Sequence, residues 1–135
     1  MTDMWPTSIT EPTTVTPPIA VLKKAAMELS KKTNGLLTGH IETAAAFPTL
    51  PGSSDLTHAF FIVATALNEY QYKLLDVRHG INLYPANVHP REGLPNDLNR
   101  KAENPEKLER ALQEVFASPK VVEIVQSLLA QSKAA

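Results

Sequence analysis

The chain has 135 residues, of which 43% are hydrophobic and 20% are charged, and it contains no cysteine. These values are typical of one globular domain and exclude disulfides, a thiolate nucleophile and cysteine-based metal sites. Thirteen basic residues against fourteen acidic ones give a net charge of −1, without the basic excess typical of nucleic-acid-binding domains. We therefore expect no nucleic-acid partner. The longest apolar run is too short to span a bilayer, and we see no secretion signal, so we expect no membrane association and a cytoplasmic protein.

The first residues of the chain are rich in threonine and proline and nearly free of aliphatic side chains. Such a segment buries too little apolar area to offset the entropy lost on ordering, so we expect a flexible or extended arm over residues 1–16. Trp5 is the exception, because an isolated tryptophan on an arm can anchor it to a partner. A loosely packed side chain near a terminus is the alternative. Residues 17–135 are then expected to form a single domain.

The first helix is predicted to begin at Pro17 or Pro18, with Thr16 as its N-cap and a proline in its first turn. The apolar residues that follow recur at helical spacing on one side. Asn34 and Gly35 come next, and this pair readily adopts the left-handed conformation that ends a helix. The sequence therefore predicts a helix that stops just before Asn34.

Four strands are predicted after this helix. Residues 36–45 alternate between apolar and polar side chains, and residues 47–54, with two prolines, are expected to be a loop. Residues 58–67 are apolar at both odd and even positions, which is typical of a strand buried on both faces. A tight turn at 68–69 leads into residues 70–79, and residues 81–88 complete a three-stranded meander, with Tyr84-Pro85 favouring an edge position for its last strand.

The strand over residues 70–79 contains a change of face. Tyr72, Asp76 and Arg78 lie at even positions and so share one face, but the apolar side chains move from the even to the odd positions near Leu74 and Leu75. Two explanations remain open, a β-bulge at this point or a strand whose halves are covered on different sides.

Two helices close the chain, and each is predicted from a capping residue followed by proline, at Asn104-Pro105 and Ser118-Pro119. Each carries an apolar stripe on one side, and Pro119 should set the two helices at an angle. The order of elements is therefore α-β-β-β-β-α-α. Helices bury their apolar stripes against a sheet, so we expect an α+β two-layer sandwich with an antiparallel sheet of about four strands and three helices.

No phosphate-binding loop, nucleophile elbow or metal-binding motif is present in the sequence. The densest polar cluster is Tyr72, Asp76, Arg78 and His79, where Arg78 could orient an anion and His79 could move a proton. These four residues are the candidate ligand or partner site, and a solvated strand end is the alternative. We name no catalytic residue and expect no cofactor.

A metal site has one candidate ligand pair, His40 and Glu42, which lie two residues apart on a strand and so share a face. A metal needs at least one further ligand, and half-exposed histidines on strands are usually inert. We therefore predict no metal site.

An interface is expected if all three helices cover the same face of the sheet. The other face would then expose Phe60 and Ile62, or Phe61 and Val63, and an apolar patch of this kind marks an interface. The alternative is that helices cover both faces. With Trp5 on the arm, Phe60, Phe61 and Ile62 are the candidate interface residues. The sequence thus favours a small non-enzymatic binding or assembly protein that acts as a homodimer, with another protein as a further partner. The alternative is a small-molecule-binding or enzymatic domain with its pocket near Asp76, Arg78 and His79.

Overall fold

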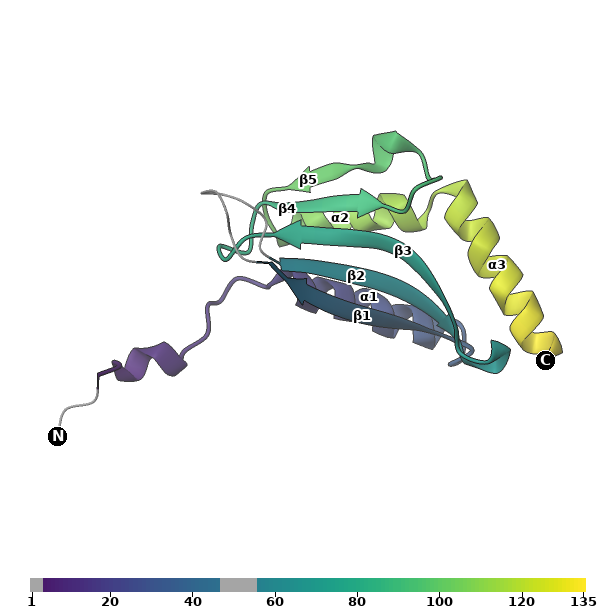
Figure 1. The fold of residues 1–135 in the computed structure, drawn as a ribbon, viewed down its shortest axis with the longest axis horizontal. Helices are drawn as coiled ribbons and strands as arrows, with labels where there is room; N and C mark the ends of the chain where they lie inside the picture. The colour runs from purple at the N-terminus through teal and green to yellow at the C-terminus, as the bar shows by residue number, and fades with distance from the viewer. Residues whose placement is uncertain (1–3, 47–55) are drawn as a thin grey trace.

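A computed structural model describes residues 4–46 and 56–135, which form three helices and one antiparallel sheet (Figure 1). The helices are α1 (Pro18–Lys32), α2 (Pro105–Phe116) and α3 (Pro119–Ala134). The strands, which neighbour one another in chain order, are β1 (Leu37–Ala45), β2 (Leu56–Ala64), β3 (Tyr70–His79), β4 (Ala86–Pro90) and β5 (Arg100–Ala102). The predicted α+β sandwich is confirmed, with five strands instead of about four. The loop predicted over 47–54 lies outside the described residues.

Each helix begins at a proline, as predicted, because proline in the first turn sacrifices no helical hydrogen bond. The cap of α1 is Pro17, which makes no side-chain bond, and not Thr16. At the other end of α1, Asn34 and Gly35 have φ values of 53° and 81°, and the Gly35 N–H donates to the Ser30 carbonyl at 2.8 Å. The Asn-Gly pair therefore ends the helix in the way the sequence predicts.

The bounds of β2 and β4 differ most from the predicted ranges 58–67 and 81–88. Strand β2 ends at Ala64, since residues 65–67 form a short 3-10 turn before the left-handed Asn68 and Glu69. Strand β4 begins at Ala86 instead of residue 81, and β5 pairs with it, so β4 is not the edge strand that was predicted. With only three residues, β5 is too short to show an alternating pattern in the sequence.

The change of face in β3 comes from a β-bulge. Phe60 pairs with Leu75, but the next residue of β2, Phe61, pairs with Lys73. Leu74 is the extra residue, and both leucines are buried. The bulge is thus the correct one of the two explanations that the sequence left open. Beyond it, the residues of β3 that share the core face are Leu75, Val77 and His79, and those on the opposite face are Asp76 and Arg78.

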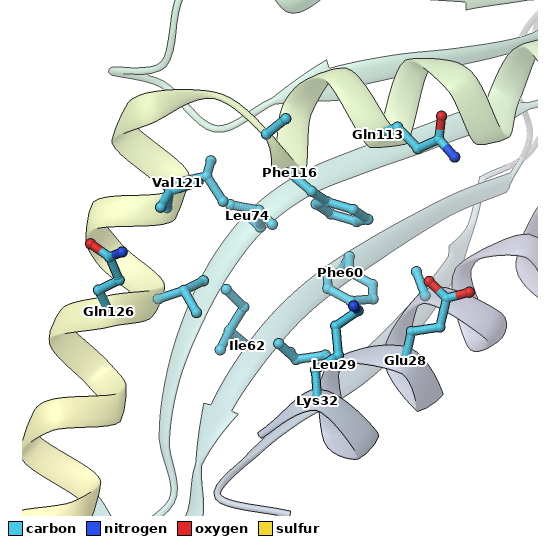
Figure 2. A pocket seen from close by; sticks show the side chains of 14 residues that line it. Glu28, Leu29, Lys32, Phe60, Ile62, Leu74, Gln113, Phe116, Val121 and Gln126 are labelled. Atoms are coloured by element: carbon cyan, nitrogen blue, oxygen red, sulfur yellow. The ribbon is translucent and has the colours of Figure 1, made fainter. Parts of the chain in front are cut away.

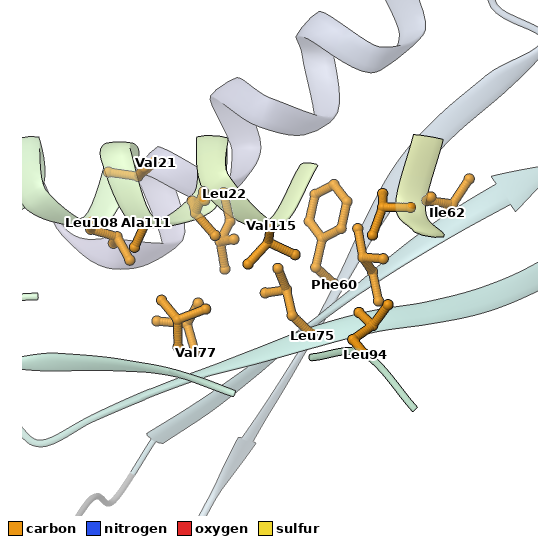
Figure 3. Packing of buried hydrophobic residues seen from close by; sticks show 14 of the residues in the cluster. Val21, Leu22, Phe60, Ile62, Leu75, Val77, Leu94, Leu108, Ala111 and Val115 are labelled. Carbon is orange, nitrogen blue, oxygen red and sulfur yellow. The ribbon is translucent and has the colours of Figure 1, made fainter. Parts of the chain in front are cut away.

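The helices cover one face of the sheet. Helices α1 and α2 lie side by side behind it, and α3 leaves α2 at a steep angle and runs past the far end of the strands (Figure 1). Lys24 of α1 and Glu109 of α2 form an ion pair of 2.9 Å between the two helices. The core fills the space between the layers, as Figure 3 shows for side chains that include Leu22, Phe60, Leu75 and Val115.

The other face of the sheet, which we call the open face, is covered by none of the described helices. Strand β2 shows the asymmetry: Phe60 and Ile62 are 2% and 1% exposed beneath the helices, whereas Phe61 and Val63 on the open face are half-buried. The prediction that this strand is buried on both faces is therefore wrong. Its open-face residues are apolar but are covered only in part, by neighbouring side chains of the sheet.

Candidate functional site

A hollow of about 420 Å³ lies between α1 and α3 on the helical side of the sheet (Figure 2). We call it the α1–α3 groove. It is lined by Ala25, Glu28, Leu29, Lys32, Phe60, Ile62, Leu74, Gln113, Phe116, Ala117, Val121, Val122, Val125 and Gln126. Its volume falls within the range of about 300–1,000 Å³ that is typical of binding pockets.

The groove exists because the steep departure of α3 leaves part of the sheet without a helix above it. Its floor is formed by Phe60, Ile62 and Leu74, which point up from β2 and β3 between the two helices (Figure 2). The apolar stripes of α1 and α3 supply lining residues on either side of the floor, among them Leu29 on α1 and Val125 on α3. The Ser118-Pro119 break between α2 and α3 therefore determines the opening of the groove.

The chemistry of the groove is apolar below and polar at the rim. Ten of its fourteen lining residues are apolar, and the other four, Glu28, Lys32, Gln113 and Gln126, are all exposed. Pockets for small polar molecules place a few polar groups inside, where they fix the orientation of the ligand. Here the lining offers no polar group at the floor. The groove therefore suits apolar side chains or hydrocarbon chains better than polar molecules.

A second hollow, of about 490 Å³, lies between α3 and the start of β3. It is lined by Leu67, Tyr70, Tyr72, Glu123, Ile124, Ser127, Leu128 and Gln131. Tyr72 also lies beneath the guanidinium of Arg91, whose carbon is 4.2 Å from the ring centroid. Of the predicted site residues, Tyr72 is thus placed in a cavity, although none of the other three lines it.

Asp76 and Arg78 lie on the open face. Oδ2 of the Asp76 carboxylate is 3.0 Å from Nζ of Lys73 and 3.8 Å from a guanidinium nitrogen of Arg78. Its other oxygen, Oδ1, is buried without a hydrogen-bond partner among the described residues. The lysine and arginine are about half exposed, so these ion pairs are worth no more than about 1 kcal/mol each.

His79 belongs to a buried chain of hydrogen bonds on the opposite side of the sheet. Its Nε2 is 2.8 Å from Nε2 of His58, and its Nδ1 is 2.7 Å from the Gly80 carbonyl. His58 continues the chain through Nδ1, which is 2.8 Å from Oγ1 of Thr43. Both histidines are almost fully buried, and Thr43 is exposed.

The partners determine which atoms carry protons in this chain when both rings are neutral. A carbonyl only accepts, so Nδ1–H of His79 donates to Gly80 and its Nε2 must accept from His58. Nδ1 of His58 is then unprotonated and accepts from the Thr43 hydroxyl. Burial, followed by the like charge of His79, lowers the pKa of His58 from its ordinary value of 6.5.

Sequence analysis did not single out His58 or Thr43, and the reason is the bulge. Without the shift in register, Asp76 would lie opposite His58, and His79 would point to the other face. The bulge makes the two histidines diagonal neighbours on the core face. The polarity pattern left the bulge as one of two explanations, and the pairing of the two histidines follows only once the register of β2 and β3 is known.

The four predicted ligand residues consequently do not surround one cavity: Asp76 and Arg78 face one side of the sheet, Tyr72 and His79 the other. The predicted interface residues also separate. Trp5 is 73% exposed on the arm, Phe61 lies on the open face, and Phe60 and Ile62 form the floor of the α1–α3 groove.

The candidate metal pair, His40 and Glu42, is in contact on the open face, with 3.4 Å between Nε2 and Oε1. Within residues 4–46 and 56–135, no group of three or more potential metal ligands comes together. The same part of the chain holds no helix with the length and apolar character needed to cross a membrane. Comparisons of the chain with family models, with curated proteins and with solved structures found no match.

Proposed function

We propose that this chain is a non-enzymatic binding protein whose α1–α3 groove takes up apolar side chains of a protein segment. The observation that carries the proposal is the composition of the groove, an apolar floor and walls beneath four exposed polar residues. Protein interfaces have the same arrangement, an apolar centre within a polar rim. The groove is also lined by residues of all three helices and of the sheet, and sites built on helices and strands hold their geometry better than sites built on loops.

A display library of random 12-residue peptides tests this function. Binders are selected on the full-length protein, and their affinities are compared with those for two variants. Val122→Asp places a charge on a groove wall that is 38% exposed, so folding should tolerate it. Met27→Asp is the matched control, because Met27 is 74% exposed and lies on α1 about 200° around the helix from the lining residue Ala25.

The selected peptides should be rich in apolar residues and should bind wild type and Met27→Asp equally. Val122→Asp should lose at least about tenfold in affinity, because it buries a charge without a partner. Equal binding to Val122→Asp, or a library without binders, would overturn the proposal. Native mass spectrometry of the purified protein adds one check. A fatty-acid adduct that Val122→Asp lacks would show that the groove binds a lipid and not a protein segment.

A hydrolytic function is the second candidate, and one observation favours it. The Thr43 hydroxyl donates to Nδ1 of His58, which His79 orients from behind, and a nucleophile beside an oriented base is typical of covalent catalysis. Neither hollow described above is lined by Thr43, so substrate binding has no evident place. Labelling by a fluorophosphonate probe that Thr43→Val abolishes would support this function, and an unlabelled wild-type protein would dismiss it.

A further inference from the structure

The N-terminal arm exposes large apolar side chains to solvent. Every residue from 4 to 16 is exposed, and Met4, Trp5, Ile9 and Val15 are 97%, 73%, 55% and 45% accessible. Figure 1 shows the arm running away from the sheet and the helices, with a short 3-10 turn at Thr7–Thr10. Exposed apolar side chains gathered on one segment are typical of a segment that binds another surface.

The base of the arm is held in place, and this determines where the arm can go. The Tyr84 hydroxyl donates to the Thr16 carbonyl at 2.8 Å, and Pro17 follows in the polyproline conformation, with φ −71° and ψ 155°. The chain therefore leaves the body at the N-terminus of α1. The groove lies beside the other half of that helix, from Ala25 to Lys32, so the arm of the same chain would have to reverse its direction to enter it.

The arm is long enough to reach a neighbouring molecule instead. A four-residue 3-10 turn rises about 2 Å per residue and an extended segment about 3 Å, which places Trp5 roughly 30 Å from Thr16. In a dimer with two-fold symmetry, each arm can cover the groove of the other copy. The 13 described arm residues and 14 groove residues amount to 27 per copy, within the 20–30 residues a side that are typical of stable interfaces.

We propose that the α1–α3 groove is occupied by the N-terminal arm of a second copy of this chain, with Trp5 as the anchor. The inference rests on the proposed function, because it names the occupant of the same groove. The groove supplies apolar surface without an internal polar group, and the arm supplies apolar side chains without a surface of its own. Exchange of the arms buries the apolar surface of the groove and the apolar side chains of the arm in one symmetric contact.

The single tryptophan of the chain makes the test direct. Emission from Trp5 is measured over a wide range of concentrations of the full-length protein, together with the mass in solution. As dimers form, the emission should shift to shorter wavelength and the mass should double from 14.8 kDa. Val122→Asp should remain a monomer with solvent-exposed emission, and Met27→Asp should behave like wild type.

Three outcomes would overturn the inference. A monomer with short-wavelength emission at every concentration would place the arm in its own groove. A dimer in which Trp5 stays exposed would place the interface elsewhere, and dissociation by Phe61→Asp would then identify the open face. A monomer with exposed Trp5 at all concentrations would show that the arm binds no copy of this chain.

A second experiment separates failure of this inference from failure of the proposed function. A synthetic peptide of residues 1–16 is added to full-length Trp5→Ala protein, so that the only tryptophan in the sample belongs to the peptide. A saturable shift to shorter wavelength that Val122→Asp/Trp5→Ala does not give would support exchange of the arms. If the arm peptide fails while library peptides still bind the groove, the inference falls and the proposed function stands; if neither binds, both fall.

Discussion

His58 lies in an environment that disfavours its protonated form. Its two ring nitrogens are both engaged, one with Thr43 and one with His79, in a pattern that suits two neutral rings. A proton added to His58 brings a positive charge into a nearly buried site beside a second histidine. Because burial disfavours this charge, the pKa of His58 is lowered.

The first prediction concerns stability below neutral pH. Above the ordinary pKa of 6.5, His58 is neutral in the folded and the unfolded chain and adds no pH dependence. Between 6.5 and the lower pKa of the folded state, the unfolded chain binds more protons, so the free energy of unfolding must fall as the pH falls. Melting temperatures measured from pH 7.5 to pH 5 should decrease most steeply below 6.5.

Substitution of the histidine tests the assignment. His58→Gln should flatten this part of the pH profile, whatever it does to stability at neutral pH, since glutamine does not titrate. His40→Gln is the control, because the His40 side chain is about half exposed on the open face and should leave the profile unchanged. An unaltered slope in His58→Gln would assign the acid sensitivity to another group.

Two helix caps that look equivalent in the sequence differ in the structure. The Asn104 side chain accepts the Lys107 N–H at 2.8 Å, whereas Ser118 makes no cap bond and its hydroxyl is buried without a partner among the described residues. Asn104→Ala should therefore lower the free energy of unfolding by about 1 kcal/mol. Ser118→Ala should change it little or raise it, because it removes an unsatisfied polar group. Urea denaturation of both variants checks the contrast, and equal losses would contradict it.

Helix α1 approaches β1 so closely that only glycine fits at position 39. A Cβ atom there would lie 2.5 Å from Cβ and 2.7 Å from Cα of Ala26. Gly39→Ala should consequently cost roughly 1–3 kcal/mol of stability through displacement of the helix. Ala26→Gly alone should cost about 1 kcal/mol through helix propensity. Together the two should cost less than the sum, because the contact is partly relieved; additive losses in denaturation would argue against the contact.

Sequence patterns predict the elements better than their ends. The three helices follow from proline positions and apolar spacing, and the turn at residues 68–69 lies where the sequence predicts it. The end of β2 at Ala64 was not predictable, since Ala66 and Leu67 continue the apolar run after Thr65 and the 3-10 turn that they form with it contacts α3. Strand β5 escaped prediction because its pairing with β4 is a tertiary contact.

The candidate site was predictable only in its parts. The apolar residues of its walls, such as Leu29 and Val125, are visible as helical stripes, and the apolar character of β2 is equally clear. Their arrangement as an open groove depends on the angle at which α3 leaves α2, a tertiary feature that no local pattern of residues specifies. The densest polar cluster of the sequence includes Asp76, Arg78 and His79, and the sheet separates them: Asp76 and Arg78 lie on the open face and His79 on the core face.

At the scale of the whole molecule, the two surfaces available for assembly differ in chemistry. The open face mixes Phe61 and Val63 with the charged side chains of Lys73, Asp76 and Arg78. The α1–α3 groove has no charge below its rim. Desolvation of charges opposes association, so Phe61→Asp should leave the mass in solution unchanged, whereas Val122→Asp should halve it. Analytical ultracentrifugation of the two variants distinguishes the surfaces, and the reverse result would favour the open face.

The order of the strands has a consequence for how the chain folds. Each strand pairs with its neighbours along the sequence, so the sheet can grow by one hairpin after another, and each closure spans a short loop with a small entropic cost. All five strands also precede α3 in the chain. Since α3 supplies one wall of the α1–α3 groove, the groove is completed last, and the proposed exchange of arms would require two molecules that have finished folding.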